Sequence, residues 1–443
     1  MKLGYSISWT SIHRVLGSPV TGLGGFYAVT QMANLGISIV LAHQLRDLLE
    51  ISHFEQASLV TYFFSFFWLN GFIQAFQIKH RPLQTGQFFS FYLMISGLAL
   101  GFMVGILLIQ RGIGFLMFNQ IQIPYIHQFA VFMIFSIPLH VLALWFFHQG
   151  NTLSQWLFSV AYNLSRILAF LVPLIMNQSL TTCLWVLCSM TFIWHVGMVI
   201  LLRRKKEWTW NGDFAKALFS GTISLSAYAL LGSLTHLIPA WIINIQLNQH
   251  DDFAIYRYGA KEVPLLSGIL ISLTVAYLPA LKKSIPEGLK ELKKGTIFLH
   301  HLIFPGIILL IWLTPFLFTL LFGPIFIPAG LVFIILTLTT TTRLIFSQTV
   351  LMALDKNKLL LVSIIGELTI NFIASYILAQ RLGLAGLALG TLTGYLFEKL
   401  LMIIYLRRYQ HISLGDYYPV KLGLIYNSLL WISVVLVWTF YYG

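Results

Sequence analysis

Charged residues are scarce in this chain. Only 9% of its 443 residues are Asp, Glu, Lys or Arg, whereas 58% are hydrophobic and 15% are aromatic. Roughly a quarter of the residues of a soluble protein are charged. No soluble core has room for this much apolar surface, so the composition excludes a soluble globular protein.

Cysteine is scarce as well. Cys183 and Cys188 lie five residues apart in one apolar run, a spacing that points their side chains to different sides of a helix. The sequence therefore predicts no disulfide and no cysteine metal site, and the singly spread histidines predict no other metal site and no cofactor. A small-residue cleavage pattern is also missing after the polar residues 2–14, so we expect the first apolar segment to remain as a helix.

Long apolar runs are abundant instead. Runs of about 18 to 25 residues match the length that a helix needs to cross roughly 30 Å of hydrocarbon at about 1.5 Å per residue. They predict an all-α polytopic membrane protein. The candidate spans are residues 20–43, 56–78, 86–110, 127–148, 153–176, 179–202, 218–244, 254–281, 296–322, 327–353, 358–379, 383–406 and 423–441.

The basic residues fall on one side of these spans. Alternate loops hold nineteen Lys and Arg on one side and three, Arg46, Arg111 and Arg381, on the other. This asymmetry predicts a cytoplasmic N-terminus and a multi-pass protein of the inner (plasma) membrane. The net charge of +13 is explained by these loop residues, which orient the protein and attract anionic lipid headgroups. We therefore expect no nucleic-acid partner. The last segment, 423–441, either spans the membrane or lies at its interface.

A weak internal repeat indicates how the spans are organised. A shift of 205 residues aligns the fifth span with the eleventh, so that Arg166 falls on Asn371 and Tyr162 on Glu367. Two halves related by a twofold axis along the membrane normal explain such a repeat. We predict twelve core helices in two six-helix lobes, followed by a further C-terminal helix. The divisions are residues 1–202, the cytoplasmic connector 203–216, residues 217–408 and the tail 409–443.

Eight charged residues fall inside the spans. A charge in mid-bilayer costs about 2.5–3.5 kcal/mol on insertion scales, so such residues usually face a water-filled cavity or a partner. We predict substrate cavity roles or structural ion pairs for most of them. The eight are Arg166, Arg257, Lys261, Arg343, Lys399, Glu262, Glu367 and Glu398.

Two arginines lie in the middle of their spans. Arg166 shares a helical face with Tyr162 and Asn163, which predicts a cavity-facing polar stripe. Arg343 follows a threonine run that offers hydroxyl groups, and Thr340 and Ser347 share its face. The alternative for either arginine is a structural ion pair with Glu367.

Arg257 and Lys261 are four residues apart near the outer end of the eighth span. Like charges at this spacing repel each other, so a nearby anion would stabilise the pair. The alternative is that both side chains extend to the outer interface. We assign Glu262 and Glu367 to ion coupling or to a structural ion pair, and Asn371 to the cavity. Interface anchoring is the expected role of Glu398 and Lys399.

Several short motifs resemble the multidrug/oligosaccharidyl-lipid/polysaccharide exporter superfamily, in its polysaccharide (O-antigen type) flippase branch. The Ala-Arg-x-Leu-Gly run that often follows the family's first helix is replaced here by LAHQL at residues 41–45, a departure that concerns the branch. Within 381–391, the glycines 383, 386 and 390 allow helices to approach closely. The matching segments are LFG at 321–323, Pro328-Ala329, LMALDKNK at 351–358, Asn371, RLGLAGLALGT at 381–391 and FAIYRYGA at 253–260.

The resemblance implies two six-helix lobes around a cavity that opens to alternate sides. The cargo it implies is an oligosaccharide on undecaprenyl pyrophosphate, moved for cell-surface polysaccharide or lipopolysaccharide assembly. The pathway's polymerase and glycosyltransferases are then possible partners. Arg166, Arg343, Arg257 and Lys261 suit a pyrophosphate or acidic sugars, because a guanidinium binds phosphate through two hydrogen bonds.

Two other functions stay open from the sequence. Multidrug or lipid II export belongs to the same superfamily, although cation export favours acidic cavities and the lipid II branch usually has fourteen helices. A membrane glycosyltransferase or polymerase needs acids or arginines on a substantial outer loop. Here the outer loops are short, and their acids are read as solvated charges, so we expect no enzyme. Those acids are Asp47, Glu50, Glu55, Asp251 and Asp252.

Overall fold

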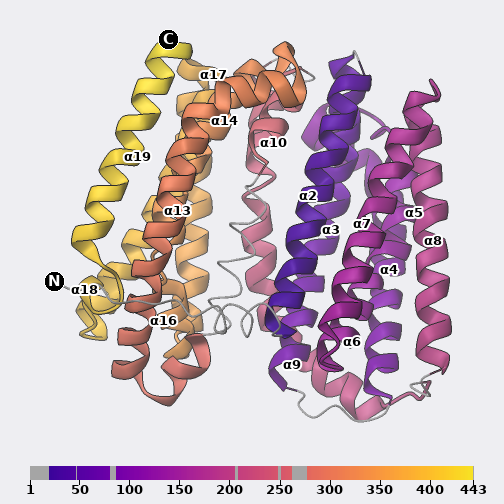
Figure 1. Cartoon of the computed structure of the whole chain (residues 1–443), viewed down its shortest axis with the longest axis horizontal. Coiled ribbons are helices and arrows are strands. Elements are labelled where there is room, and N and C mark those ends of the chain that lie inside the picture. Colours follow the sequence, from indigo (N-terminus) through magenta and orange to yellow (C-terminus); the bar gives the residue numbers. More distant parts are fainter. Residues whose placement is uncertain are drawn as a thin grey trace.

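The computed structural model describes residues 19–45, 47–79, 86–204, 208–247, 251–261 and 277–442. These residues form helices and connecting turns, with no strand among them (Figure 1). Ten stretches of them are long and apolar enough to cross a membrane, and several of the ten contain more than one helix. The predicted all-α polytopic fold is therefore confirmed.

The N-terminal helices match the predicted spans with one interruption. Span 127–148 is two helices, because Pro138 has no backbone N–H to donate within a helix and its ring obstructs the preceding turn. The helices are α2 (Pro19–Gln44), α3 (Leu48–Lys79), α4 (Gln87–Phe118), α5 (Ile126–Ser136), α6 (Leu139–His148), α7 (Thr152–Ile175) and α8 (Leu180–Arg204).

The C-terminal helices are more often broken. Span 218–244 divides at residues 235–237, and part of the eighth span lies outside the described residues. The elements are α9 (Gly212–Leu234), α10 (Ile238–Gln246), α11 (Asp251–Gly259), α13 (Ile285–Phe322), the 3-10 helix η1 (Pro324–Phe326), α14 (Ile327–Thr337), α15 (Thr340–Arg343), α16 (Ser347–Ala353), α17 (Asn357–Tyr409), α18 (Leu414–Tyr417) and α19 (Val420–Tyr441).

The tenth span is broken beside Arg343, where a continuous helix over 327–353 is the expectation. The backbone N–H groups of Thr339, Thr341 and Thr342 bond to carbonyls three residues earlier. Their side-chain hydroxyls donate to the same three carbonyls, at 2.7–2.8 Å. Because these hydroxyls compete for helical acceptors, the threonine run favours tight turns over an α-helix. The sequence expectation of an unbroken span is corrected here.

Spans eleven and twelve form a single bent element, α17. Gly383 makes the bend with φ 55° and ψ −132°, a left-handed region that glycine enters at little cost. After the bend, Gly386, Gly390 and Gly394 face the first half of α17. A Cβ at Gly394 would lie 2.8 Å from the Cβ of Asn371. The small residues therefore allow the close helix approach that the sequence predicts.

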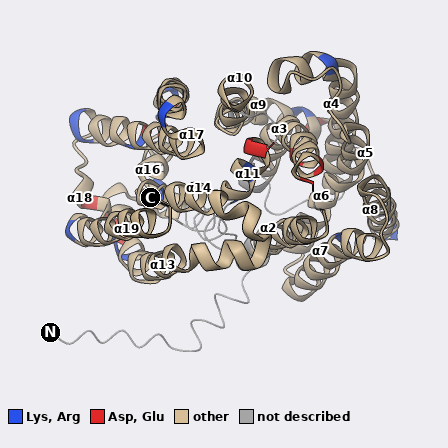
Figure 2. Ribbon diagram, turned by 90° about the horizontal axis from the view of Figure 1, so that it is seen from above, with Lys and Arg blue, Asp and Glu red and all other residues tan. Residues whose placement is uncertain are grey.

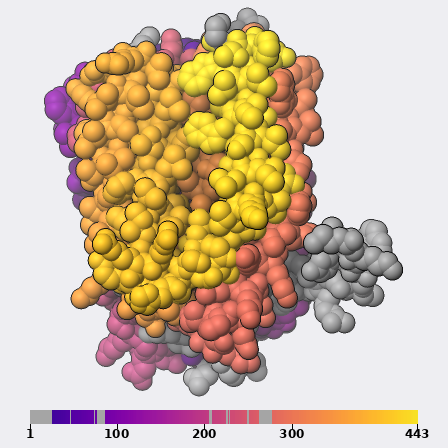
Figure 3. Space-filling view, turned by 90° about the vertical axis from the view of Figure 1, so that its left-hand side faces the viewer, coloured from indigo at the N-terminus to yellow at the C-terminus, as the bar shows by residue number. Residues whose placement is uncertain are grey.

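The C-terminal helix α19 is long enough to span a membrane. It runs alongside α13 over the face shown in Figure 3. Its 22 residues extend about 33 Å at 1.5 Å per residue, enough to cross the hydrocarbon core. The ring nitrogen Nδ1 of His301 lies 2.9 Å from the Tyr426 hydroxyl, and Phe304 stacks on Tyr426. These contacts favour a spanning helix over an interfacial one.

Contacts between helices connect the N-terminal and C-terminal parts of the chain. Helix α3 packs against α9 and α11, α4 against α10, and α2 against α13. Seen from above, α11 lies beside α3 near the centre of the molecule (Figure 2). The division into lobes at 1–202 and 217–408 stays a prediction, and α9, which that division assigns to the second lobe, packs along α3 of the first.

The close packing at Gly390 can be tested by measuring the stability of a variant. In Gly390→Ala, the added Cβ would overlap the backbone of Ser375. We expect this overpacking to lower the free energy of unfolding by about 1–3 kcal/mol. The matched control is Gly101→Ala in α4, where a Cβ meets no described atom within 4 Å. Thermal unfolding of both variants in detergent measures the difference, and equal midpoints would contradict the packing argument.

Candidate functional site

Three of the predicted basic residues line one cavity. Arg257 and Lys261 come from α11 and the residues after it, and Arg343 comes from the end of α15. The cavity measures about 110 Å³, which is room for several water molecules. Its polar lining is completed by Thr235, His236, Tyr256, Thr337, Thr339, Thr340, Thr391 and Tyr395.

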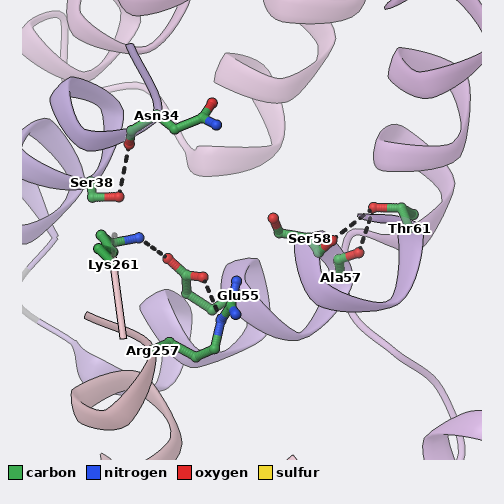
Figure 4. Close-up of polar contacts among 8 residues, drawn as sticks. All are labelled: Asn34, Ser38, Glu55, Ala57, Ser58, Thr61, Arg257 and Lys261. Atoms are coloured by element: carbon green, nitrogen blue, oxygen red, sulfur yellow. Dashed lines mark hydrogen bonds and ion pairs between the residues drawn. The ribbon is translucent and has the colours of Figure 1, made fainter. Parts of the chain in front are cut away.

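Glu55 lies between Arg257 and Lys261 (Figure 4). One carboxylate oxygen, Oε2, accepts a hydrogen bond from Arg257 Nε at 3.0 Å, and the other, Oε1, accepts one from Lys261 Nζ at 2.8 Å. The Glu55 side chain is 3% exposed. The anion that the repelling pair requires is therefore supplied by the chain itself, from a helix 202 residues away.

Glu55 corrects one sequence expectation. The sequence places it in the first outer loop as a solvated charge, but α3 begins at Leu48 and includes it. Seven residues of helix put Glu55 about 10 Å below the start of α3. An acid buried at that depth needs a partner, because an uncompensated charge in a medium of low polarity is costly. Residues 48–56 contain no glycine or proline. This absence of helix breakers could have predicted that the helix begins early enough to include Glu55.

Glu55, Arg257 and Lys261 form a triad in which two cations share one carboxylate, so these three groups together carry a net charge of +1. The side chains of Arg257 and Lys261 are still 24% and 20% exposed. Both line the cavity, whereas Glu55 is absent from its lining. Lys261 Nζ also lies 4.7 Å from the centre of the Tyr258 ring, and the Tyr258 hydroxyl donates to the Ser38 carbonyl at 3.0 Å. Among the described residues that line the cavity, three are Lys or Arg and none is Asp or Glu.

Arg343 keeps only part of its predicted surroundings. Thr340 lines the cavity with it. Ser347, which the sequence places on the same face, is instead fully buried and lies 2.8 Å from the Tyr417 hydroxyl. The break between α15 and α16 separates the two residues, so helical spacing does not apply across it.

Arg166 lies apart from this cavity, among α2, α5 and α7. Its Nη1 donates to Asn163 Oδ1 at 3.0 Å and its Nη2 to Asn34 Oδ1 at 2.8 Å. The rings of Phe132 and Tyr162 lie 5.7 and 5.8 Å from the guanidinium carbon. Within the described residues no carboxylate forms an ion pair with Arg166. Neutral amides and rings hold this guanidinium without cancelling its charge.

Two further predicted site residues, Glu367 and Asn371, lie on α17. Glu367 is 2% exposed and accepts hydrogen bonds from the Thr235 hydroxyl at 3.2 and 3.3 Å. The described part of the chain shows no ion pair between Glu367 and Arg166 or Arg343. Asn371 is fully buried, and its Oδ1 accepts a hydrogen bond from Ser375 at 2.9 Å. Glu262 lies outside the described residues, and the roles of all three acidic and amide groups stay predictions.

Glu398 and Lys399 differ from the interface anchors that the sequence indicates. They pair with each other at 3.6 Å, and their side chains are 8% and 11% exposed. Both residues are buried within the described structure, although other residues of the same part of α17 are exposed.

No protein-family model and no curated protein sequence matches the chain. Solved structures match over almost its full length. The lipid II flippase MurJ, in an inward closed conformation, has a TM-score of 0.61 at 13% identity, covering 94% of this chain and 91% of that one. A mutant of the MATE transporter VcmN from Vibrio cholerae has a TM-score of 0.63 at 11% identity, covering 91% and 99%.

A third similar structure is a MOP superfamily transporter from Pyrococcus furiosus, with a TM-score of 0.58 at 12% identity, covering 93% of this chain and 95% of that one. At these identities the likeness establishes the fold. Together with the ten membrane-length stretches, it makes the chain a multi-pass plasma membrane protein. The chain has the fold of the multidrug/oligosaccharidyl-lipid/polysaccharide exporter (MOP) superfamily, as its sequence motifs indicate.

Proposed function

We propose that this chain is a flippase that turns an undecaprenyl-pyrophosphate-linked oligosaccharide from the cytoplasmic to the outer leaflet by alternating access. The observation that carries the proposal is the cavity within the membrane-spanning helices that Arg257, Lys261 and Arg343 line together. The solved structures that share the fold are transporters and a flippase, which supports transport over catalysis. The cargo would serve assembly of a cell-surface polysaccharide, with the pathway's polymerase and glycosyltransferases as partners.

The sign of the cavity charge supports an anionic cargo. A cation within hydrocarbon is costly unless a partner or water compensates it. Glu55 compensates one of the two charges on Arg257 and Lys261, and the remaining charge attracts an anion. A cationic drug would be repelled by the same face, which argues against multidrug export.

The chemistry of the lining suits a sugar diphosphate. Arginine presents a planar fork that matches two phosphate oxygens. Tyr256 and Tyr395 add rings with apolar faces and polar hydroxyls, the type of surface on which a sugar packs. A cavity of about 110 Å³ suits a diphosphate and is too small for an oligosaccharide. The sugars would therefore occupy space that opens as the helices separate, while the lipid tail stays in the bilayer.

Lipid II export is the alternative with a specific observation in its favour. The likeness to the lipid II flippase covers 94% of this chain, and a lipid-linked pyrophosphate carries the same anionic group. We favour an oligosaccharide cargo because the sequence motifs resemble the polysaccharide branch and thirteen spans differ from the fourteen of the lipid II branch. If the protein were instead a glycosyltransferase or polymerase, the purified protein would transfer sugars.

Arg343 provides the first test. In proteoliposomes given an undecaprenyl-pyrophosphate oligosaccharide, we expect Arg343→Ala to lower the translocation rate roughly tenfold or more, since charge-assisted hydrogen bonds to phosphate are lost. Arg343→Lys keeps the charge without the fork and should lie between. The control is Arg381→Ala, which removes an exposed arginine. Normal transport by Arg343→Ala would refute the cavity assignment, and wild-type transport of lipid II alone would favour the alternative.

Arg166 provides an independent test in the N-terminal part of the chain. Its amide and aromatic neighbours leave the guanidinium charge available to an anion. We expect Arg166→Ala to reduce translocation roughly tenfold while the thermal midpoint in detergent stays close to that of the wild type. Arg111→Ala, which removes an exposed arginine from α4, is the matched control. A large loss of stability with normal transport per folded molecule would assign Arg166 a structural role.

A further inference from the structure

Glu55 occupies the position that an anionic cargo would require. We propose that Glu55 is an internal counter-anion that holds the outer parts of α3 and α11 together, and that the phosphate of the cargo releases this contact by competing for Arg257 and Lys261. The inference rests on the proposed function, because it needs an anionic cargo. It assigns Glu55 as the residue that couples occupancy of the cavity to outward opening.

The geometry of the triad resembles phosphate recognition. Each carboxylate oxygen of Glu55 takes one cation, at 3.0 Å from Arg257 and 2.8 Å from Lys261. Two oxygens of a phosphate group can contact the same two cations in the same manner. Figure 4 shows the carboxylate placed between the two side chains, with α3 supplying the acid, α11 supplying Arg257, and the residues directly after α11 supplying Lys261.

Arg257 and Lys261 are accessible from the cavity as well as from Glu55. Glu55 is buried and absent from the cavity lining, whereas Arg257 and Lys261 both line the cavity and keep about a quarter and a fifth of their side chains exposed. An anion that enters the cavity therefore meets the side of the cations that faces away from Glu55. Both side chains are long and flexible, so they can turn toward that anion without a movement of α11.

The triad lies where loss of the Glu55 contacts would affect the packing of α3 against α11. Glu55 lies seven residues from the outer start of α3, and Arg257 lies six residues from the outer start of α11, so both are about 10 Å inside the outer ends. Close by, the Tyr258 hydroxyl joins α11 to the Ser38 carbonyl of α2. Helix α11 thereby contacts both α2 and α3 at one level. Loss of the Glu55 contacts would leave Glu55 buried without a cation, which favours separation of α3 from α11 and hydration of the carboxylate.

If the cargo anion and the Glu55 carboxylate compete for Arg257 and Lys261, each must weaken the binding of the other. If a cargo anion weakens the Glu55 contact, then removal of the Glu55 charge must strengthen anion binding by the same coupling free energy. A fixed charge beside the site also weakens anion binding, but it predicts no separation of α3 from α11 when the anion binds. The two roles are therefore separated by the binding change together with the distance between the outer ends of the two helices.

The experiment measures binding and opening with the full chain in detergent micelles. Inorganic pyrophosphate is the probe, and titration calorimetry gives its dissociation constant. Spin labels at Leu49→Cys on α3 and Asp251→Cys on α11 report the distance between the outer ends, in a background from which Cys183 and Cys188 are removed. Both label sites are exposed, and both native cysteines are buried.

We expect pyrophosphate to bind Glu55→Gln roughly tenfold more tightly than the wild type, within the usual range of coupling between sites. In the wild type, pyrophosphate should shift the label distances to longer values. In Glu55→Gln the longer distances should be present without pyrophosphate. Glu50→Gln is the matched control, because it removes the same charge from the same helix five residues away and should change neither readout.

Two results would overturn the inference. The first is equal or weaker pyrophosphate binding by Glu55→Gln. The second is a label distance in the wild type that saturating pyrophosphate does not change, which would reduce Glu55 to a fixed charge beside the site. If Glu55→Gln does not fold, Glu55→Asp replaces it, since a carboxylate one methylene shorter weakens both contacts. The same directions of change at smaller size support the inference, and their absence overturns it.

These outcomes are distinct from failure of the proposed function. A wild-type protein that shows the pyrophosphate responses but moves no lipid-linked oligosaccharide in proteoliposomes retains the Glu55 mechanism and loses the cargo assignment. A protein that moves the oligosaccharide while its label distances ignore pyrophosphate retains the cargo and loses the mechanism.

Discussion

Hydrocarbon offers no hydrogen bonds, and the architecture of this protein follows from that constraint. Every backbone group at membrane depth needs an internal partner, so the chain forms helices, and irregular backbone is confined to places where protein or water surrounds it. Two of its helix breaks meet that condition at the same place. Residues 235–237 separate α9 from α10, and residues 338–339 separate α14 from α15. Thr235, His236 and Thr339 from these breaks all line the cavity.

The same constraint explains the partners of the buried charges. Arg257 and Lys261 share a carboxylate, whereas Arg166 is held by two amides and two rings. A carboxylate partner lowers the energy of a buried cation by cancelling its charge, but an amide partner only orients it. Among the described residues, Glu55 therefore cancels part of the charge of one cationic cluster, whereas Arg166 is oriented by neutral partners. Both arrangements keep positive charge among helices of membrane-spanning length.

The amino-acid sequence predicts the helices well because lipid is a uniform solvent that acts on each segment separately. Apolar length alone located most of the spans, and the asymmetry of the basic loops predicts their orientation. The partner of Arg257 was out of reach of such local reasoning, because Glu55 is 202 residues away and its pairing depends on how α3 and α11 pack. The prediction for Ser347 was wrong for a different reason. Helical spacing placed it beside Arg343, but α15 ends at Arg343 and α16 begins only at Ser347, so the spacing of a continuous helix does not apply.

The two parts of the chain reach similar chemistry with different residues. In the 205-residue alignment Arg166 corresponds to Asn371, yet Arg166 keeps partial exposure while Asn371 is fully buried against Ser375 and the glycine face of α17. In the hairpin α17, a longer side chain at position 371 would meet the second half of the helix, because a Cβ at Gly394 would already lie 2.8 Å from the Asn371 Cβ. The described cations of the C-terminal part that line the cavity lie instead on α11, directly after α11 and at the end of α15, beside breaks between helices.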